Sequence, residues 1–123
     1  MKTINQANPP RRLWIYFASD APVGVILKRG PTDWVQLVKW DVANDSFEPG
    51  QWLKARVDEQ SFDISPDGRL IVYWARANSA RELDTWTAVS KPPYFTALAL
   101  WPWYGTYWGG GFFENSQRLW LSG

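Results

Sequence analysis

The chain has 123 residues and a formal net charge of +1, with 13 basic and 12 acidic residues spread along it. It contains no cysteine and no histidine, which excludes disulfides, thiolate nucleophiles, cysteine-based zinc sites and a Ser-His triad within this chain. No run of basic residues exceeds two, so the charge pattern predicts no nucleic-acid-binding face.

The composition is that of a globular protein with a core of flat rings. Apolar residues make up 46% of the chain, which contains ten tryptophans. Stacked sheets accommodate so many rings better than a helical bundle filled with leucine. No apolar run approaches the roughly 20 residues that a membrane helix needs, and the N-terminal residues lack the apolar segment of a signal peptide. We therefore expect a cytoplasmic protein without a membrane partner.

In the first half of the chain, short β-rich runs follow a polar segment. Residues 1–11, which include Pro9-Pro10, are predicted to form a flexible arm. The most regular alternation of apolar and polar residues runs from Trp34 to Trp40 and predicts a half-buried strand. Turn residues separate the predicted strands, which cover 13–18, 23–28, 34–40 and 47–57, the last interrupted by Pro49-Gly50.

The second half repeats this pattern. Pro66-Asp67-Gly68 predicts a tight hairpin turn between strands at 61–65 and 69–74. Apolar runs at 85–89 and 94–103 follow. A glycine-rich segment then precedes a final hairpin, with strands at 112–113 and 118–121.

Similar phrases recur along the chain. Arg12-Leu13-Trp14-Ile15 is nearly repeated as Arg118-Leu119-Trp120-Leu121, and Arg69-Leu70-Ile71-Val72 lies between them. Thr32-Asp33-Trp34 recurs as Asp84-Thr85-Trp86, so the two tryptophans are 52 residues apart. Spacings of about 50 residues with four strands per period are typical of propeller blades.

The segment Phe62-Asp63-Ile64-Ser65-Pro66-Asp67-Gly68-Arg69-Leu70-Ile71-Val72-Tyr73 resembles the signature hairpin of TolB-like propeller repeats. Val38-Lys39-Trp40-Asp41-Val42-Ala43-Asn44-Asp45 is similar to the end of the third strand in WD-type repeats. The resemblance implies an all-β fold of propeller-blade-like antiparallel sheets, forming a partial or oligomer-completed propeller. A two-sheet sandwich or a small barrel is the alternative. The predicted repeats cover about 12–60 and 61–108, and a third begins at 109–123.

Strand alternation also predicts which side chains are buried. One face of each strand should point inward, and the other should meet solvent. The predicted core positions are Leu13, Ile15, Trp34, Leu37, Leu70, Val72, Leu98 and Leu119.

The inventory of catalytic groups is poor. The close carboxylate pairs, Asp58-Glu59 and Glu82 with Asp84, are interpreted as solvated loop charge because sequence adjacency does not set the separation that a glycosidase requires. We expect no enzyme activity, no cofactor and no metal site. Asp67 with Gly68 is better explained by a turn than by a calcium loop, which needs a higher density of oxygen ligands.

An aromatic and glycine-rich segment at 101–111 is the strongest candidate for a ligand site. Rings offer stacking platforms for sugars, and glycines allow a ligand to approach the backbone closely. Packing between sheets, with rings filling the space and glycines forming sharp corners, explains the same residues and is the preferred interpretation. The candidate ligand-binding residues are Trp101, Trp103, Tyr104, Tyr107 and Trp108.

Three functions follow from these observations. The leading hypothesis is a non-catalytic binding or scaffold module that engages a protein partner. The alternatives are recognition of a carbohydrate-like ligand by the aromatic segment, and the propeller portion of a carboxylate-dependent enzyme. About two blades would expose ring-rich faces, so we also expect self-association or a longer propeller. The predicted contact residues are Trp14, Phe112, Phe113 and Trp120.

Overall fold

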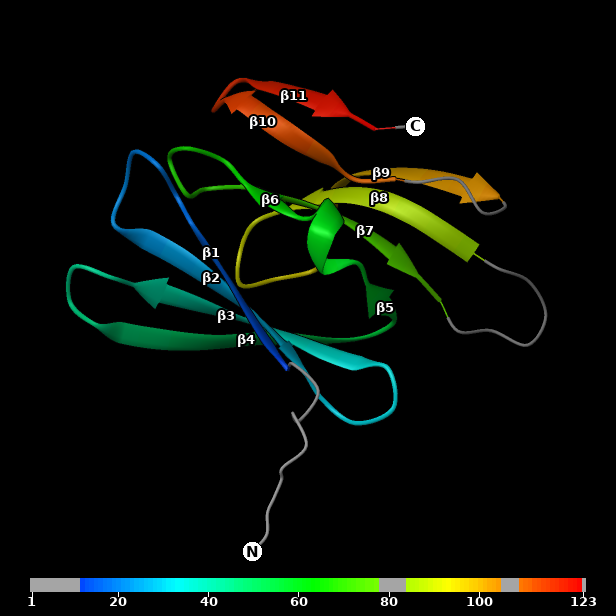
Figure 1. The fold of residues 1–123 in the computed structure, drawn as a ribbon, viewed down its shortest axis with the longest axis horizontal. Coiled ribbons are helices and arrows are strands. Elements are labelled where there is room, and N and C mark those ends of the chain that lie inside the picture. The colour runs from blue at the N-terminus through cyan, green and yellow to red at the C-terminus, as the bar shows by residue number, and fades with distance from the viewer. Residues whose placement is uncertain (1–11, 78–83, 105–108, 123) are drawn as a thin grey trace, which may run out of the picture.

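The computed structural model describes residues 12–77, 84–104 and 109–122. These residues form an all-β, antiparallel fold with three sheets that follow one another along the chain (Figure 1). The first sheet is a meander in which each strand pairs with the next in sequence. Its strands are β1 (Leu13–Phe17), β2 (Val23–Arg29), β3 (Trp34–Asp41) and β4 (Ser46–Lys54).

The second sheet has the same order, with two short strands in the first position. β5 and β6 both pair with β7, β5 near its end and β6 at its start, and a single 3₁₀ turn lies between them. The elements are β5 (Arg56–Val57), η1 (Glu59–Ser61), β6 (Asp63–Ile64), β7 (Ile71–Arg76), β8 (Asp84–Ser90) and β9 (Ala97–Tyr104). The third sheet is the hairpin of β10 (Gly111–Asn115) and β11 (Arg118–Leu121). Among the described residues no sheet closes into a barrel.

The three hairpin turns that open these sheets lie next to one another at the upper left of Figure 1. The backbone N–H of Asp20 donates to the Pro66 carbonyl (2.9 Å). The N–H of Asp67 donates to Ser116 Oγ (3.2 Å), and the N–H of Phe113 donates to Asp63 Oδ2 (2.7 Å). The hairpins β1–β2, β6–β7 and β10–β11 are therefore linked in series.

The core lies between the first two sheets. Buried side chains of the first sheet meet those of the second, and the ring of Tyr16 stacks on Phe62 with centroids 4.3 Å apart. The Tyr16 hydroxyl donates to the Glu59 carbonyl (2.5 Å). The core includes Val25, Leu27, Val35 and Leu37 from the first sheet and Phe62, Ile64, Ile71 and Tyr73 from the second.

β4 runs through Pro49-Gly50 as one strand, but its pairing with β3 is irregular there, because the register shifts between the pairs Gln36–Trp52 and Val38–Pro49. β4 is an edge strand, where proline does not remove a ladder hydrogen bond. Gly50 is required by close packing: a Cβ there would lie 2.0 Å from the Pro93 carbonyl oxygen. The neighbouring Gln51 accepts from the N–H groups of Phe95 (2.7 Å) and Thr96 (3.0 Å) and fixes the β8–β9 connection on β4.

The predicted core is right in part. Leu37 and Val72 are fully buried, and Leu70 and Leu119 are half-buried. The prediction is wrong for Leu13, Ile15, Trp34 and Leu98, which are exposed. Leu13 and Ile15 lie on the face of β1 that points away from the second sheet, while Trp14 and Tyr16 pack against the core. Leu98 lies on the edge strand β9.

The repeated phrases are not all equivalent in the structure. Leu13-Trp14-Ile15 belongs to β1, the first strand of its sheet, whereas Ile71-Val72 and Leu119-Trp120-Leu121 belong to second strands. The repeated segments around Trp34 and Trp86 do lie in corresponding strands. Trp34 belongs to β3 and Trp86 to β8, and each of these is the third strand of its sheet. Trp40-Asp41 ends β3, and a turn follows.

Candidate binding surface

The predicted ligand segment is described only in part. Trp101 lies on β9 and is exposed. Trp103 and Tyr104 belong to the same strand, but their side chains are outside the description, and Tyr107 and Trp108 lie outside the described residues. The predicted aromatic ligand site remains a prediction.

The predicted contact residues lie at two places. Phe112 and Trp120 pair across the β10–β11 hairpin and are 55% and 49% exposed, while Phe113 is half-buried. Trp14 points inward from β1, where the Arg29 guanidinium carbon lies 4.6 Å from the centre of its ring. At β1 the exposed apolar side chains are therefore the neighbours of Trp14.

These neighbours belong to an apolar surface that extends over all four strands of the first sheet. Residues that are paired between neighbouring strands lie on the same face of the sheet. Ile15 of β1 pairs with Ile26 of β2, which pairs with Val38 of β3, so these three side chains share the outer face. Phe17 is joined in the same way to Trp40 and Phe47 at the other end of the sheet. We call this surface the aromatic face; it consists of Leu13, Ile15, Phe17, Ile26, Trp34, Val38, Trp40, Phe47, Pro49 and Trp52.

The rings of the aromatic face are ordered by contacts with one another. The Trp40 ring lies between Phe17 (centroids 5.5 Å apart) and Phe47 (5.3 Å, stacked). Its Nε1 donates to Asp45 Oδ1 (3.2 Å). A Cβ at Gly24 would lie only 3.2 Å from Phe17 Cδ1, so the glycine lets the Phe17 ring lie across β2. A partner would therefore meet a preformed ladder of rings, and little side-chain entropy would be lost on binding.

The aromatic face is large for an uncovered surface. Leu13, Ile15, Phe17, Phe47 and Trp52 are all close to half exposed. At about 100 Å² for each half-exposed side chain of this size, they present about 500 Å² of apolar surface. That is comparable to the largest apolar patch on a typical monomer, about 300–600 Å², and such patches are often functional.

The sequence contained a signal for this surface that strand alternation alone did not reveal. Residues 13–17 are apolar at every position, so both faces of β1 are apolar. A strand of this kind needs cover on both sides. The second sheet covers the face of Trp14 and Tyr16, and no other described part of the chain covers the face of Leu13 and Ile15.

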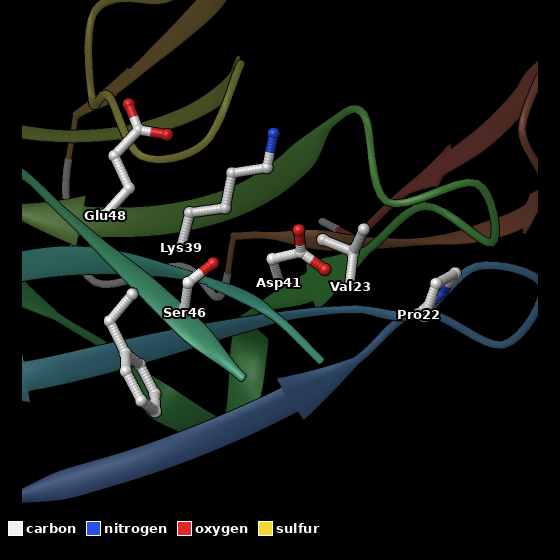
Figure 2. Close-up of a pocket in the computed structure, with 7 residues that line it drawn as sticks. Pro22, Val23, Lys39, Asp41, Ser46 and Glu48 are labelled. Carbon is white, nitrogen blue, oxygen red and sulfur yellow. The ribbon is translucent and has the colours of Figure 1, made fainter. Parts of the chain in front are cut away.

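A pocket of about 350 Å³ lies at the end of the first sheet. Figure 2 shows Lys39, Asp41 and Glu48 among its lining side chains, together with Pro22 and Val23. Hydrogen bonds from the side chain and backbone of Asn44 hold the pKa of Asp41 below its ordinary value, so this carboxylate stays ionised and serves the β3–β4 turn. The pocket is open and mixed in charge.

The predicted carboxylate pair Asp58-Glu59 has structural partners. Asp58 caps η1 and accepts from Gln60 N (3.1 Å) and Ser61 Oγ (2.9 Å). Glu59 forms an ion pair with Arg29 (3.4 Å). Of the other pair, Glu82 lies outside the described residues, and the side chain of Asp84 is outside the description.

In the parts of the chain that the structure describes, no group of three or more acidic side chains is arranged to hold a metal ion. Within the same residues, no helix has the length and apolar character needed to cross a membrane. The aromatic face is therefore the feature with the clearest functional content. No protein-family model, curated protein or solved structure matches the chain.

Proposed function

We propose that this chain is a non-catalytic binding module of propeller type, which engages a protein partner through the aromatic face. The observation that carries the proposal is the ordered set of exposed rings across β1–β4, centred on Phe17, Trp40 and Phe47. Aromatic side chains are enriched in the cores of protein interfaces, and charged ones are depleted there. The outward-facing positions of these strands carry two charged side chains, Lys28 and Lys54, both at one end of the sheet.

The shape of the surface favours a protein over a small molecule. Small-molecule sites are concave and surround most of the ligand surface. The aromatic face is one side of a continuous four-stranded sheet. The pocket beside it includes a single aromatic ring, that of Phe47, among its lining side chains, and three of the others, Lys39, Asp41 and Glu48, are charged. A second sheet or a broad protein surface matches such a face better than a sugar does.

The series of hairpins supports the propeller architecture. In a propeller, four-stranded antiparallel sheets follow one another around an axis, and their first strands lie nearest to it. Here β6 contacts both β1 and β10, and the three hairpin turns are joined by hydrogen bonds. A two-sheet sandwich, the alternative, leaves the separate β10–β11 hairpin without an assigned place.

Site-specific photo-cross-linking tests the binding function. A benzophenone amino acid replaces Ile15 on the aromatic face, and in the control it replaces Gln60, which is exposed in η1. Irradiation in the source cells should give a discrete adduct from position 15 and none from position 60. Mass spectrometry identifies the attached chain. The absence of a specific adduct at position 15 would contradict the proposed function.

A further inference from the structure

The first two sheets correspond position by position. The hairpin of β1 and β2 closes on the pair Phe17 and Gly24, and the hairpin of β6 and β7 closes on Ile64 and Ile71. The next hydrogen bond in each is also matched, from Ala18 N to the Val23 carbonyl (2.9 Å) in one and from Ser65 N to the Leu70 carbonyl (2.8 Å) in the other. Phe17 therefore corresponds to Ile64, and Ile26 corresponds to Tyr73.

In this correspondence, the exposed outer face of the first sheet matches a buried face of the second sheet. In the second sheet, the face of Ile64 and Tyr73 is buried under the first sheet. In the first sheet the equivalent face is the aromatic face. Phe17 is 56% exposed, whereas its counterpart Ile64 is 6% exposed. The packing within the chain thus indicates what fits the aromatic face, namely another apolar sheet of the same kind.

The β10–β11 hairpin is another apolar surface that the described chain leaves open. Phe112 and Trp120 lie side by side on it, and Leu121 is also exposed. Trp120 Nε1 donates to Glu114 Oε1 (3.0 Å), which orients the indole ring. The hairpin lies beyond the second sheet from the aromatic face (Figure 1). A foreign partner on the aromatic face would leave this hairpin exposed, whereas one contact between two copies covers both surfaces.

We propose that the partner of the aromatic face is a second copy of this chain, whose β10–β11 hairpin packs on it through Phe112 and Trp120. This inference rests on the proposed binding function and names its partner. The two surfaces differ, so the contact is head-to-tail and generates a ring or an open row of copies. A net charge of only +1 opposes such association weakly.

Size-exclusion chromatography with light scattering tests the contact on the full chain. The wild type should have a mass of at least twice the 14.2 kDa of one chain. Phe17→Lys and Trp120→Lys should each be monomeric, because each places a charge in one of the two surfaces. Ile15→Lys and Phe112→Lys are the second variants for each surface, and Gln60→Lys is the control that keeps the wild-type mass. Circular dichroism verifies that each variant is folded.

Mixing the two monomeric variants distinguishes a head-to-tail contact from a two-fold contact. Phe17→Lys keeps an intact hairpin and Trp120→Lys keeps an intact aromatic face, so together they should form a one-to-one complex. A two-fold contact between aromatic faces would instead leave Trp120→Lys associated alone and give no complex on mixing, which overturns the head-to-tail proposal.

A monomeric wild type also overturns the inference. The binding function then still stands if cross-linking at position 15 captures a different protein. It fails with the inference if position 15 gives no adduct at all. An adduct of two identical chains, joined from position 15 to the hairpin, supports both.

Discussion

Asp67 organises the turn between β6 and β7 through both its side chain and its backbone. Its Oδ1 accepts from Ser65 Oγ (2.7 Å) and Arg69 N (3.0 Å), and its N–H donates to Ser116 Oγ (3.2 Å) in the next hairpin. The hydrogen bond from Ser65, followed by that from Arg69, lowers the pKa of Asp67. Gly68 has a positive φ of 76°, which explains why glycine follows this aspartate.

The lowered pKa of Asp67 predicts a dependence of stability on acid. Because the folded state favours the ionised carboxylate, its contribution is present above the ordinary pKa of about 3.9 and is lost as the pH falls through the lowered value. Asp67→Asn should therefore lower the urea midpoint of unfolding at neutral pH. In acid, the urea midpoints of wild type and variant should differ less than they do at neutral pH. An equal difference at both pH values would show that ionisation of Asp67 does not stabilise the fold.

Tyr73 offers a second test at the residue scale. Its hydroxyl donates to the buried Phe95 carbonyl (2.7 Å), and its ring meets Phe95 edge-on with centroids 5.3 Å apart. Tyr73→Phe leaves that carbonyl without its donor and should destabilise the protein by about 1–3 kcal/mol in urea unfolding. Tyr94→Phe, at an exposed neighbouring ring, is the matched control and should change stability by less than about 0.5 kcal/mol.

At the scale of the strand, burial separates residues that look alike in sequence. Leu37 is fully buried in β3, whereas Leu13 is exposed in β1. Leu37→Ala should reduce the free energy of unfolding by about 2–5 kcal/mol, through lost contacts and a cavity. Leu13→Ala in the monomeric Trp120→Lys background should change it by less than about 0.5 kcal/mol, since no described side chain covers this position. Similar losses at both positions would contradict the assignment of the two faces.

Most strands could be predicted from the sequence, because alternation and turn residues are local signals. The Pro66-Asp67-Gly68 hairpin and the strand around Trp34–Trp40 are examples, and both occur in the structure. The inward face of β1 could not be predicted in this way. Leu13 and Ile15 alternate with Trp14 and Tyr16, so period alone does not distinguish the covered face from the open one.

Interactions between distant elements were equally invisible at the level of the strand. Gln51 fixes a loop about 45 residues away, and only the folded structure brings the two together. β4 continues through Pro49 because it is an edge strand, and edge position is a property of the sheet rather than of the segment. The candidate binding surface depends on sheet pairing in the same way, because its rings come from β1, β3 and β4.

For the whole molecule, the arrangement of sheets explains how one surface is left over. Each described sheet covers one face of the next. The aromatic face, on the outer side of the first sheet, therefore has no cover within the described chain. A sheet that is apolar on both faces needs cover on both of them. Parallel sheets meet the same need with helices on their two faces. The expectation of ring-rich exposed faces therefore follows from the order of sheets more directly than from the repeated phrases.

The chemistry of the aromatic face predicts how association responds to solvent. The outward-facing positions of its strands carry many rings and, as charged side chains, Lys28 and Lys54, so contact with the hairpin should be driven by apolar burial. Sodium sulfate should strengthen association and cooling should weaken it, because excluded salts favour burial and hydrophobic stabilisation falls at low temperature. Sodium chloride should weaken it little, since screening acts on charge pairs. Sedimentation velocity measures all three effects, with Phe17→Lys as the control that stays monomeric. Dissociation of the wild type by moderate sodium chloride would instead identify an electrostatic interface, in which the rings are not the main contact.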